Sequence, residues 1–224
     1  MNLERIELKQ VAIGYEQLLA EKVEIALPRK EIVRVHGATG SGKSTLLKVM
    51  AGLLNPLSGQ YLINDLDVNQ MSFEELIPIR LKIGYSFDMG GLLNNRTLRE
   101  NLMLPLLYHK VATIDEIEAR VRSTLEAFEL TKVADKRPAS VSGSQRKAAC
   151  VARAFVFEPQ FLILDDPTTG LGDSQRECLA RWINERKKSG QLRFCILTSQ
   201  NQRFLQELAP IELNLHPELK AEAA

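Results

Sequence analysis

A glycine-rich loop between an apolar strand and an apolar helix constrains this chain more than any other feature. The loop reads G-A-T-G-S-G-K-S-T over Gly37–Thr45, with the strand Ile32–Val35 before it and the helical stretch Leu46–Met50 after it. Glycines let successive backbone N–H groups face one anion, and the helix N-terminus adds unpaired N–H groups and a positive dipole end. The pattern G-x-x-x-x-G-K-[ST] in this setting predicts a site for a nucleoside triphosphate.

The positions of this loop have distinct expected roles. Lys43 is expected to reach the outer phosphates, and the Ser44 hydroxyl to ligate Mg²⁺. A glycine-rich turn that matches the pattern by accident is the alternative, and the flanking strand and helix argue against it. The residues expected to contact the phosphates are Gly37, Ala38, Thr39, Gly40, Ser41, Gly42, Lys43, Ser44 and Thr45.

Composition narrows the class of protein. The chain has 224 residues, enough for one large domain or a domain with an inserted subdomain, and its net charge of +1 gives no reason to expect a nucleic-acid partner. No apolar run approaches the roughly 18 residues that span a bilayer, and the N-terminus lacks a signal-peptide core, so we expect a cytoplasmic protein. Cys150, Cys178 and Cys195 lack C-x-x-C spacing, which predicts reduced, packed thiols.

Strand and helix patterns alternate along much of the chain. Alternating apolar and polar residues around Ile6–Ile13 and Val23–Leu27 predict a hairpin or a pair of strands, and charged residues 175–188 predict a helix. Strands followed by helices indicate a parallel sheet covered on both faces. Further strands are expected at Ile32–Val35, Tyr61–Ile63, Ile83–Phe87, Phe161–Leu164 and Arg193–Thr198, with turns at Asn55–Gly59 and Asn64–Asp65.

The character of the chain changes between residues 88 and 158. Leu102–Leu107 and Ile114–Phe128 show helical spacing, with charges on the opposite face. This block reads as an inserted, mostly helical subdomain between the β-rich segments 1–87 and 159–224. The last residues, 220–224, are expected to fray.

Four further segments carry a resemblance to a known family. They are Val141–Lys147 (V-S-G-S-Q-R-K), Ala152–Ala154, the strand with its carboxylates Phe161–Asp166, and Pro167–Leu171. In order and spacing, the chain resembles the ATP-binding cassette (ABC) ATPases over nearly its whole length, and Val141–Gln145 is similar to the LSGGQ signature peculiar to that family. The resemblance implies an α/β fold: a P-loop NTPase (RecA-like) core with a parallel sheet, an N-terminal antiparallel β region, and an inserted helical subdomain that carries the signature.

The resemblance also implies how ATP is held. In this family two cassettes pair head to tail and close two ATP molecules between them, which implies a homodimer or a heterodimer. Asp165, at the end of an apolar strand, would hold Mg²⁺, and Tyr15 would stack on adenine; a turn residue and a sheet-packing tyrosine are the respective alternatives. The signature residues Ser142, Gly143, Ser144 and Gln145 would meet the γ-phosphate held by the other subunit, although by themselves they also fit an ordinary helix N-cap.

Several positions depart from the family pattern. Asp166 stands where the family has a glutamate, its presumed general base. The aspartate carboxylate reaches about 1 Å less far toward the attacking water, and a misplacement of that size can lower the rate roughly 10²-fold. Ser199 replaces the switch histidine, and Asp88 replaces the strand-ending glutamine. Asp88 adds a negative charge beside the expected triphosphate unless it binds Mg²⁺. Gly172 and Ser144 replace an aspartate and a glycine. The expected catalytic residues are Asp166, Ser199 and Lys43. Because of these departures, we expect ATP to bind and its hydrolysis to be weakened.

A single cassette without a membrane span is expected to work beneath an integral membrane permease, at the inner face of the plasma membrane. The segment Gly90–Leu106 looks like that of bacterial cassettes for Mla- and Mce-type phospholipid transport, and lipoprotein-release and cell-division cassettes carry similar segments. Two hypotheses stay open: a hydrolysing motor with Asp166 as the base, and a regulatory or scaffolding module with little turnover. A better-equipped partner in an asymmetric dimer, or a soluble regulatory ATPase, are further alternatives.

Overall fold

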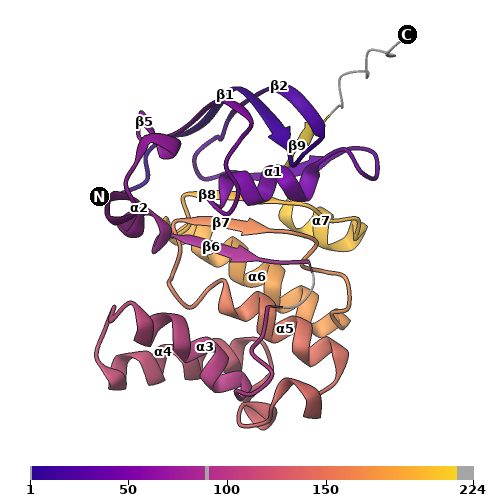
Figure 1. Ribbon diagram of the computed structural model, residues 1–224. Helices are drawn as coiled ribbons and strands as arrows, with labels where there is room; N and C mark the ends of the chain where they lie inside the picture. Colours follow the sequence, from indigo (N-terminus) through magenta and orange to yellow (C-terminus); the bar gives the residue numbers. More distant parts are fainter. Residues whose placement is uncertain (1, 89–90, 216–224) are drawn as a thin grey trace.

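The computed structural model describes residues 2–88 and 91–215 and contains two β-sheets. The four-stranded sheet has the order β2-β1-β4-β5 and is antiparallel, whereas the five-stranded sheet has the order β6-β7-β8-β3-β9 and is parallel. Figure 1 shows the antiparallel sheet above the parallel one. The strands are β1 (Ile6–Gly14), β2 (Leu18–Ala26), β3 (Ile32–His36), β4 (Ser58–Ile63), β5 (Leu66–Asp67), β6 (Ile83–Ser86), β7 (Phe161–Leu164), β8 (Phe194–Leu197) and β9 (Ile211–Asn214).

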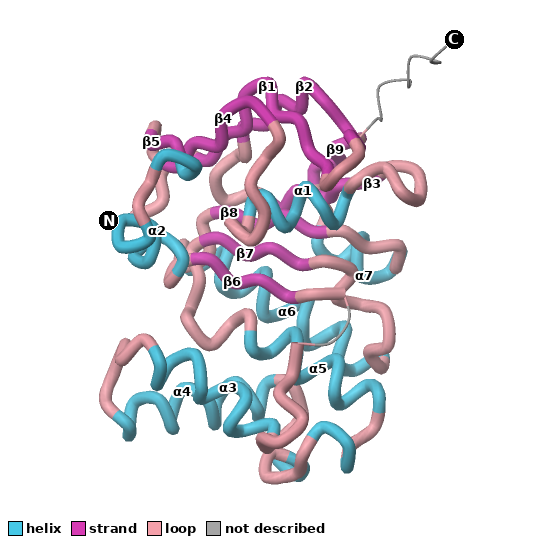
Figure 2. Tube along the Cα trace, in the orientation of Figure 1, coloured by secondary structure: helices cyan, strands magenta, loops and turns pink. Residues whose placement is uncertain are grey.

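The helices form layers around these sheets (Figure 2). Helix α1 lies between the two sheets, α5 and α6 lie on the other side of the parallel sheet, and α3 and α4 pack together at the far end of the molecule. The helices are α1 (Lys43–Met50), α2 (Phe73–Arg80), α3 (Leu98–Tyr108), α4 (Ile114–Ala127), α5 (Gly143–Arg153), α6 (Asp173–Ser189) and α7 (Gln202–Leu208). No helix in the described ranges is long and apolar enough to cross a membrane.

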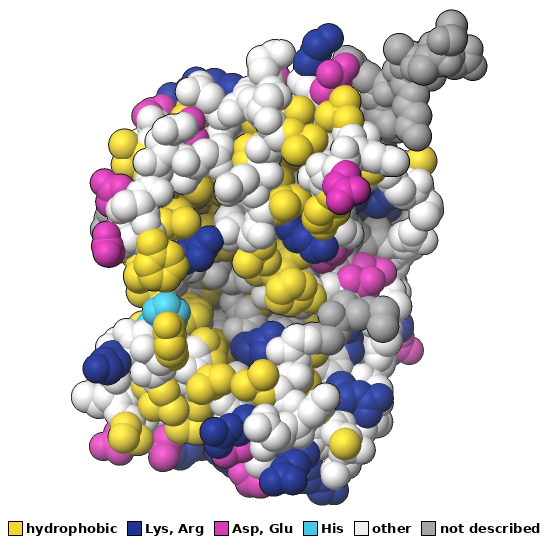
Figure 3. Space-filling view, viewed as in Figure 1, with side chains coloured by type: hydrophobic (Ala, Val, Ile, Leu, Met, Phe, Trp, Pro, Cys, Tyr) yellow, Lys and Arg dark blue, Asp and Glu magenta, His cyan; other side chains and the backbone are white. Residues whose placement is uncertain are grey.

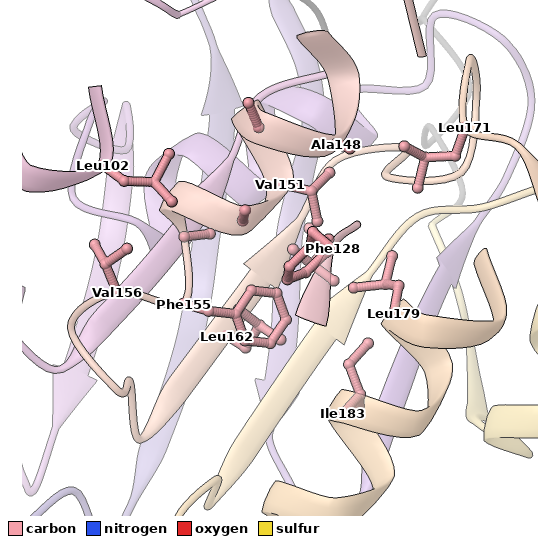
Figure 4. Close-up of a cluster of buried hydrophobic side chains, with 14 of the residues drawn as sticks. Leu102, Phe128, Ala148, Val151, Phe155, Val156, Leu162, Leu171, Leu179 and Ile183 are labelled. Atoms are coloured by element: carbon pink, nitrogen blue, oxygen red, sulfur yellow. The ribbon is translucent and has the colours of Figure 1, made fainter. Parts of the chain in front are cut away.

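The parallel sheet divides the core into two parts. Phe161 and Ile163 of β7 face the antiparallel sheet and α1, whereas the alternate residues Leu162 and Leu164 face α5 and α6. Both faces are apolar because successive strand side chains point to opposite sides and helices or sheets cover each side. Figure 4 shows the second part, where side chains of α5, α6 and β7 point toward one another.

The expected architecture is the observed one: a parallel sheet with helices, an N-terminal antiparallel region, and helices α3–α5 inserted between β6 and β7. The first two strands form a hairpin, and Cys150, Cys178 and Cys195 are buried thiols that form no disulfide within the described residues, both as expected. The subdomain boundaries at residues 88 and 158 stay predictions.

Some expected boundaries were wrong. Ser58 and Gly59 belong to β4 and not to a turn, because a bulge in β1 allows Ser58 to pair with Ala12. Phe87 was expected to end β6, and Arg193 and Thr198 to begin and end β8, but all three lie just outside the observed strands. The expected fraying at 220–224 lies outside the described residues.

Candidate functional site

A polar cavity of about 670 Å³ lies at the carboxyl edge of the parallel sheet. Open α/β sheets usually bind ligands at this edge, because the loops after the strands meet there. The cavity brings together most of the residues expected from the sequence to handle phosphate and metal. Its lining includes Gly37, Thr39, Gly40, Lys43, Ser44, Asp88, Asp165, Asp166, Thr198 and Ser199.

Glycine is required at two positions of the phosphate loop. Gly42 caps α1 with φ of 91°, a left-handed conformation that side chains disfavour. A Cβ at Gly37 would lie 2.5 Å from the carbonyl oxygen of Leu215, closer than atoms can approach. The loop is thereby curled over the first turn of α1, whose N-terminal N–H groups point toward an anion.

Two loop side chains fit a phosphate ligand. The Lys43 ammonium group donates to the carbonyl oxygens of Gly37 and Ala38 at 2.9 and 2.7 Å, so it lies over the loop itself. The Ser41 hydroxyl oxygen is buried and has no hydrogen-bond partner in the described part of the chain. A buried polar atom without a partner is costly, and a phosphate oxygen would satisfy it.

Ser44 and Asp165 form an oxygen pair suited to Mg²⁺. The Ser44 hydroxyl donates to Asp165 Oδ1 at 3.1 Å, and the Thr198 hydroxyl donates to the same oxygen at 3.0 Å. Hydroxyl and carboxylate oxygens are ligands that Mg²⁺ accepts beside phosphate. Burial, followed by the charge of Asp165, raises the pKa of the nearby Tyr85 phenol, which keeps that residue protonated.

Asp166 and Ser199 are connected through Thr168, a residue for which the sequence suggested no role. Thr168 Oγ1 lies 2.8 Å from Ser199 Oγ and donates to Asp166 Oδ1 at 3.3 Å. The Thr169 hydroxyl donates to Asp166 Oδ2 at 2.7 Å, and the Asp166 backbone N–H donates to Thr198 Oγ1 at 2.8 Å. The presumed base and switch positions therefore belong to one network of hydroxyl groups.

Asp88 faces a cation from the helical part of the chain. The buried Lys147 ammonium group of α5 donates to the Asp88 carbonyl oxygen and lies 3.6 Å from its carboxylate. This interaction places a positive charge beside the carboxylate of Asp88. The expected role of Asp88 as a metal ligand stays a prediction.

The signature residues do not line the phosphate cavity of their own chain. Ser142 caps α5, because its hydroxyl accepts from the Gln145 N–H at 3.2 Å while Gln145 Oε1 accepts from the Ser142 N–H at 3.0 Å. Ser144 Oγ lies 3.0 Å from Ser142 Oγ. Gly143 lines a separate cavity of about 610 Å³, together with Asp88 and Asp166. The expected contact of the signature with the γ-phosphate of another subunit stays a prediction.

Tyr15 is the first residue of the loop between β1 and β2. Its side chain is 55% exposed, and its hydroxyl accepts a hydrogen bond from Lys48 Nζ at 3.1 Å. The same ammonium group lies 5.8 Å from the ring centroid. An exposed ring held in this way is unlike a packed sheet residue and can stack on a planar base.

Comparison with known proteins gives a family match. The profile described as "ABC transporter" matches residues 20–169. The methionine import ATP-binding protein of Paraburkholderia xenovorans is 32% identical to this chain. The aligned region covers 80% of this chain and 46% of that relative. The lipoprotein-releasing system ATP-binding protein of Buchnera aphidicola is 32% identical over 87% of this chain and 84% of its own length.

Solved structures agree with this match. A dimeric structure of MJ0796, described as a bacterial ABC transporter cassette, aligns with a TM-score of 0.85 at 26% identity, covering 93% of this chain and 94% of the other. A dimeric post-hydrolysis state of the same cassette, bound to ADP and Pi, aligns with a TM-score of 0.82 at 25% identity. The alignment covers 94% of this chain and 96% of the other.

Proposed function

This chain belongs to the ABC transporter family, and from that premise we propose that it is an ATP-binding subunit coupled to a membrane permease. The observation that carries the proposal is the group formed by Lys43, Ser44 and Asp165 at the phosphate loop. The chain spans about half the length of the methionine-import relatives, so the activity of a whole transporter is part of the proposal.

ATP and Mg²⁺ fit the residues that line the cavity. The N–H groups of the loop and the Lys43 ammonium group would hold the phosphates, and Ser41 Oγ would gain a partner. Ser44 and Asp165 would hold the metal ion, which supplies charge neutralisation to the phosphates when it is bound. Tyr15 would stack on adenine.

A dimer of cassettes, either a homodimer or a heterodimer, would complete each site. The solved relative is dimeric, and the α5 N-terminus of this chain is capped and lies apart from its own phosphate cavity. In the proposed dimer, Ser142–Gln145 of one subunit contact the γ-phosphate held by the other.

We propose that hydrolysis is slow. Asp166 is shorter than a glutamate, and both of its carboxylate oxygens accept hydrogen bonds from its own chain. Ser199 offers a short neutral group, and removing one donor to transition-state charge typically costs about 2.7–4 kcal/mol. The alternative function is a regulatory or scaffolding cassette with little or no turnover, and the same departures from the family pattern favour it.

The permease would dock against the hollow between the sheets and the helices α3 and α4. Apolar side chains gather around this hollow in Figure 3. Phe73 of α2 is 66% exposed, and Leu104 and Tyr108 of α3 are exposed as well. We place the subunit at the inner face of the plasma membrane and propose a lipid or lipid-linked substrate, on the likeness of Gly90–Leu106 to lipid-transport cassettes and on the lipoprotein-releasing relative.

Equilibrium binding of Mg²⁺-ATP to the purified full chain tests the core of the proposal. Lys43→Ala should weaken binding by at least tenfold because it removes the one loop ammonium group from the phosphates, and a loss of 1.4 kcal/mol is already tenfold. Lys132→Ala removes an exposed lysine elsewhere and serves as the matched control. Equal affinity of the two variants would refute the assignment of the site.

Turnover separates the motor from the regulatory module. With the permease present, the variant Asp166→Glu with Ser199→His should raise the rate at least tenfold if the departures weaken hydrolysis. Robust turnover of the unmodified chain that Asp166→Asn abolishes would instead identify an ordinary motor. Co-purification with a membrane protein that transports lipid would support the substrate class, and a permease for amino acids or inorganic anions would contradict it.

A further inference from the structure

We propose that Thr168 and Thr169 are positioning residues that hold the Asp166 carboxylate against its own loop and so act as a built-in brake on ATP turnover. This inference rests on the proposed function of the cavity as an ATP site. The short side chain of Asp166 explains one part of the proposed slow turnover. The brake assigns another part to two hydroxyl groups, which can be removed without changing Asp166.

Asp166 is anchored at three points. Thr169 Oγ1 donates to one carboxylate oxygen at 2.7 Å, and Thr168 Oγ1 donates to the other at 3.3 Å. The backbone N–H donates to Thr198 Oγ1 at 2.8 Å, and the backbone is in the left-handed region with φ of 38°. With its backbone and both oxygens engaged, the carboxylate is held in one orientation, and any turn of the side chain toward an attacking water breaks existing contacts.

Proton counting extends the same restraint to Ser199. The Thr168 hydroxyl has one proton, and when it donates that proton to Asp166, Ser199 is the donor in the 2.8 Å contact between Thr168 and Ser199. Ser199 Oγ in turn accepts from the Asn201 N–H at 3.2 Å. In that arrangement the single proton of Ser199 points to Thr168, and the Ser199 hydroxyl has none left to donate to a γ-phosphate.

The energetic direction follows from the charge on Asp166. Hydrogen bonds to an ionised carboxylate are roughly twice as strong as bonds between neutral groups. A general base has to lie within about 2.6–3.2 Å of the proton it takes, or one water away. For a water that lies away from the present orientation of the carboxylate, Asp166 meets that condition only by breaking its hydrogen bonds with the threonine hydroxyls, so each hydroxyl opposes that movement.

Thr169 offers the sharper test because its side chain is exposed, whereas Thr168 is buried. Thr169→Val keeps the shape and removes the hydroxyl, and Thr169→Ser keeps the hydroxyl. Steady-state ATP hydrolysis by the full chain should rise about tenfold in Thr169→Val through kcat, with little change in KM, since a released general base can contribute ~10²–10⁴-fold. Thr169→Ser should retain the low rate.

A second variant shows whether the gain passes through Asp166. Combining Thr169→Val with Asp166→Asn should abolish the gain, an interaction that a purely structural effect of Thr169 would not produce. A rate in Thr169→Val no higher than in the unmodified chain, or a gain that persists with Asp166→Asn, would overturn the brake while ATP binding stands. Failure of the unmodified chain to bind Mg²⁺-ATP would overturn both the brake and the proposed function.

Discussion

Two residues of the proposed ATP site that depart from the family pattern, Asp88 and Ser199, have partners in the structure. Asp88 faces Lys147, and Ser199 shares a hydrogen bond with Thr168 while Arg34 Nε donates to the Ser199 carbonyl oxygen at 3.0 Å. Buried polar groups that keep their partners cost little stability. We therefore expect the site to keep its shape and its affinity for ATP even where its chemistry is slowed.

Tyr15 carries a prediction at this scale. Tyr15→Ala should weaken ATP binding by about 5- to 150-fold, because stacking of a base on an aromatic ring is worth ~1–3 kcal/mol. Tyr15→Phe should retain most of the affinity, since it keeps the ring and loses only the hydrogen bond from Lys48. The measurement is the Kd of ATP, with Tyr108→Ala as the control because Tyr108 is 77% exposed on α3. Unchanged affinity in Tyr15→Ala would exclude stacking.

Some residues of the site can be predicted from local sequence patterns, and the partners of others cannot. Gly37–Thr45 and Asp165 follow from local patterns, because a loop and its helix are contiguous in the chain. The partners of Asp88 and Ser199 do not, since Lys147 is 59 residues from Asp88 and Thr168 is 31 residues from Ser199. Such contacts depend on how the strands are ordered in the sheet, which no local pattern encodes. The assignment of these residues to ATP chemistry stays a prediction.

At the scale of elements, several helices begin with the same device. The capping box, in which Ser or Thr and a residue three positions later exchange hydrogen bonds with backbone N–H groups, opens α2, α3, α4 and α5. The pattern is present in the sequence, for example T-L-R-E at Thr97–Glu100, and it could have located α2, which the hydrophobic spacing missed. Pro78 lies inside that helix and obscures its periodicity.

The capping boxes predict a dependence of stability on pH. Hydrogen bonds from backbone N–H groups lower the pKa of Glu75, Glu100 and Glu116. Because the folded pKa lies below the unfolded value of about 4.3, the stabilisation is present above that pH and is lost as the pH falls through the folded pKa. The urea midpoint of the unmodified chain should therefore fall between pH 5 and pH 3.

Glutamine variants test this origin. Gln forms a capping box without a titrating group, as Gln145 does in α5. Replacing all three glutamates by Gln should flatten the fall in the urea midpoint below about pH 4.3. The control replaces Glu126 and Glu185, two exposed helix residues outside any capping box, by Gln. An equal fall in both triple and control variants would assign the acid sensitivity to other carboxylates.

The contact between β6 and α5 gives a further prediction about elements. A Cβ at Gly84 would lie 2.1 Å from the carbonyl oxygen of Ala154 and 2.8 Å from Pro159 Cγ. Gly84→Ala should therefore lower the free energy of unfolding by about 1–3 kcal/mol or more, measured by urea denaturation. Gly172→Ala is the control, because its φ is −71° and its nearest neighbour would be 3.8 Å away. A loss no larger in Gly84→Ala than in the control would contradict the close approach.

Some elements could not be predicted because tertiary contacts alone define them. Strand β9 has four largely exposed residues and exists through its pairing with β3. Helix α7, of seven residues, is shorter than helices that are stable in isolation. By contrast, α4 was predicted almost to its ends, since its apolar residues recur at helical spacing over four turns.

At the scale of the whole molecule, two core regions meet at the parallel sheet, and the proposed nucleotide site lies where they join. Asp165 follows β7, which packs on both regions, and Asp88 connects the end of β6 to Lys147 of α5. A ligand that contacts both the phosphate loop and Asp88 would therefore act on the two parts of the molecule at once. This arrangement is consistent with a cassette that changes shape when ATP binds and closes onto a second subunit.

Gly143→Asp tests whether ATP binding and dimer closure are separate events. The new side chain fits, since the nearest atom to a Cβ would be 3.8 Å away, and an acidic residue in the first turn suits the dipole of α5. It nevertheless places a negative charge where the γ-phosphate of the other subunit is expected. The variant should bind Mg²⁺-ATP with the affinity of the unmodified chain and fail to dimerise in light scattering, whereas Thr131→Asp, at another exposed position of the helical part, should dimerise normally. An ATP-dependent dimer of Gly143→Asp would remove the signature from the interface, because two like charges in direct contact at a closed, poorly hydrated site repel too strongly for closure.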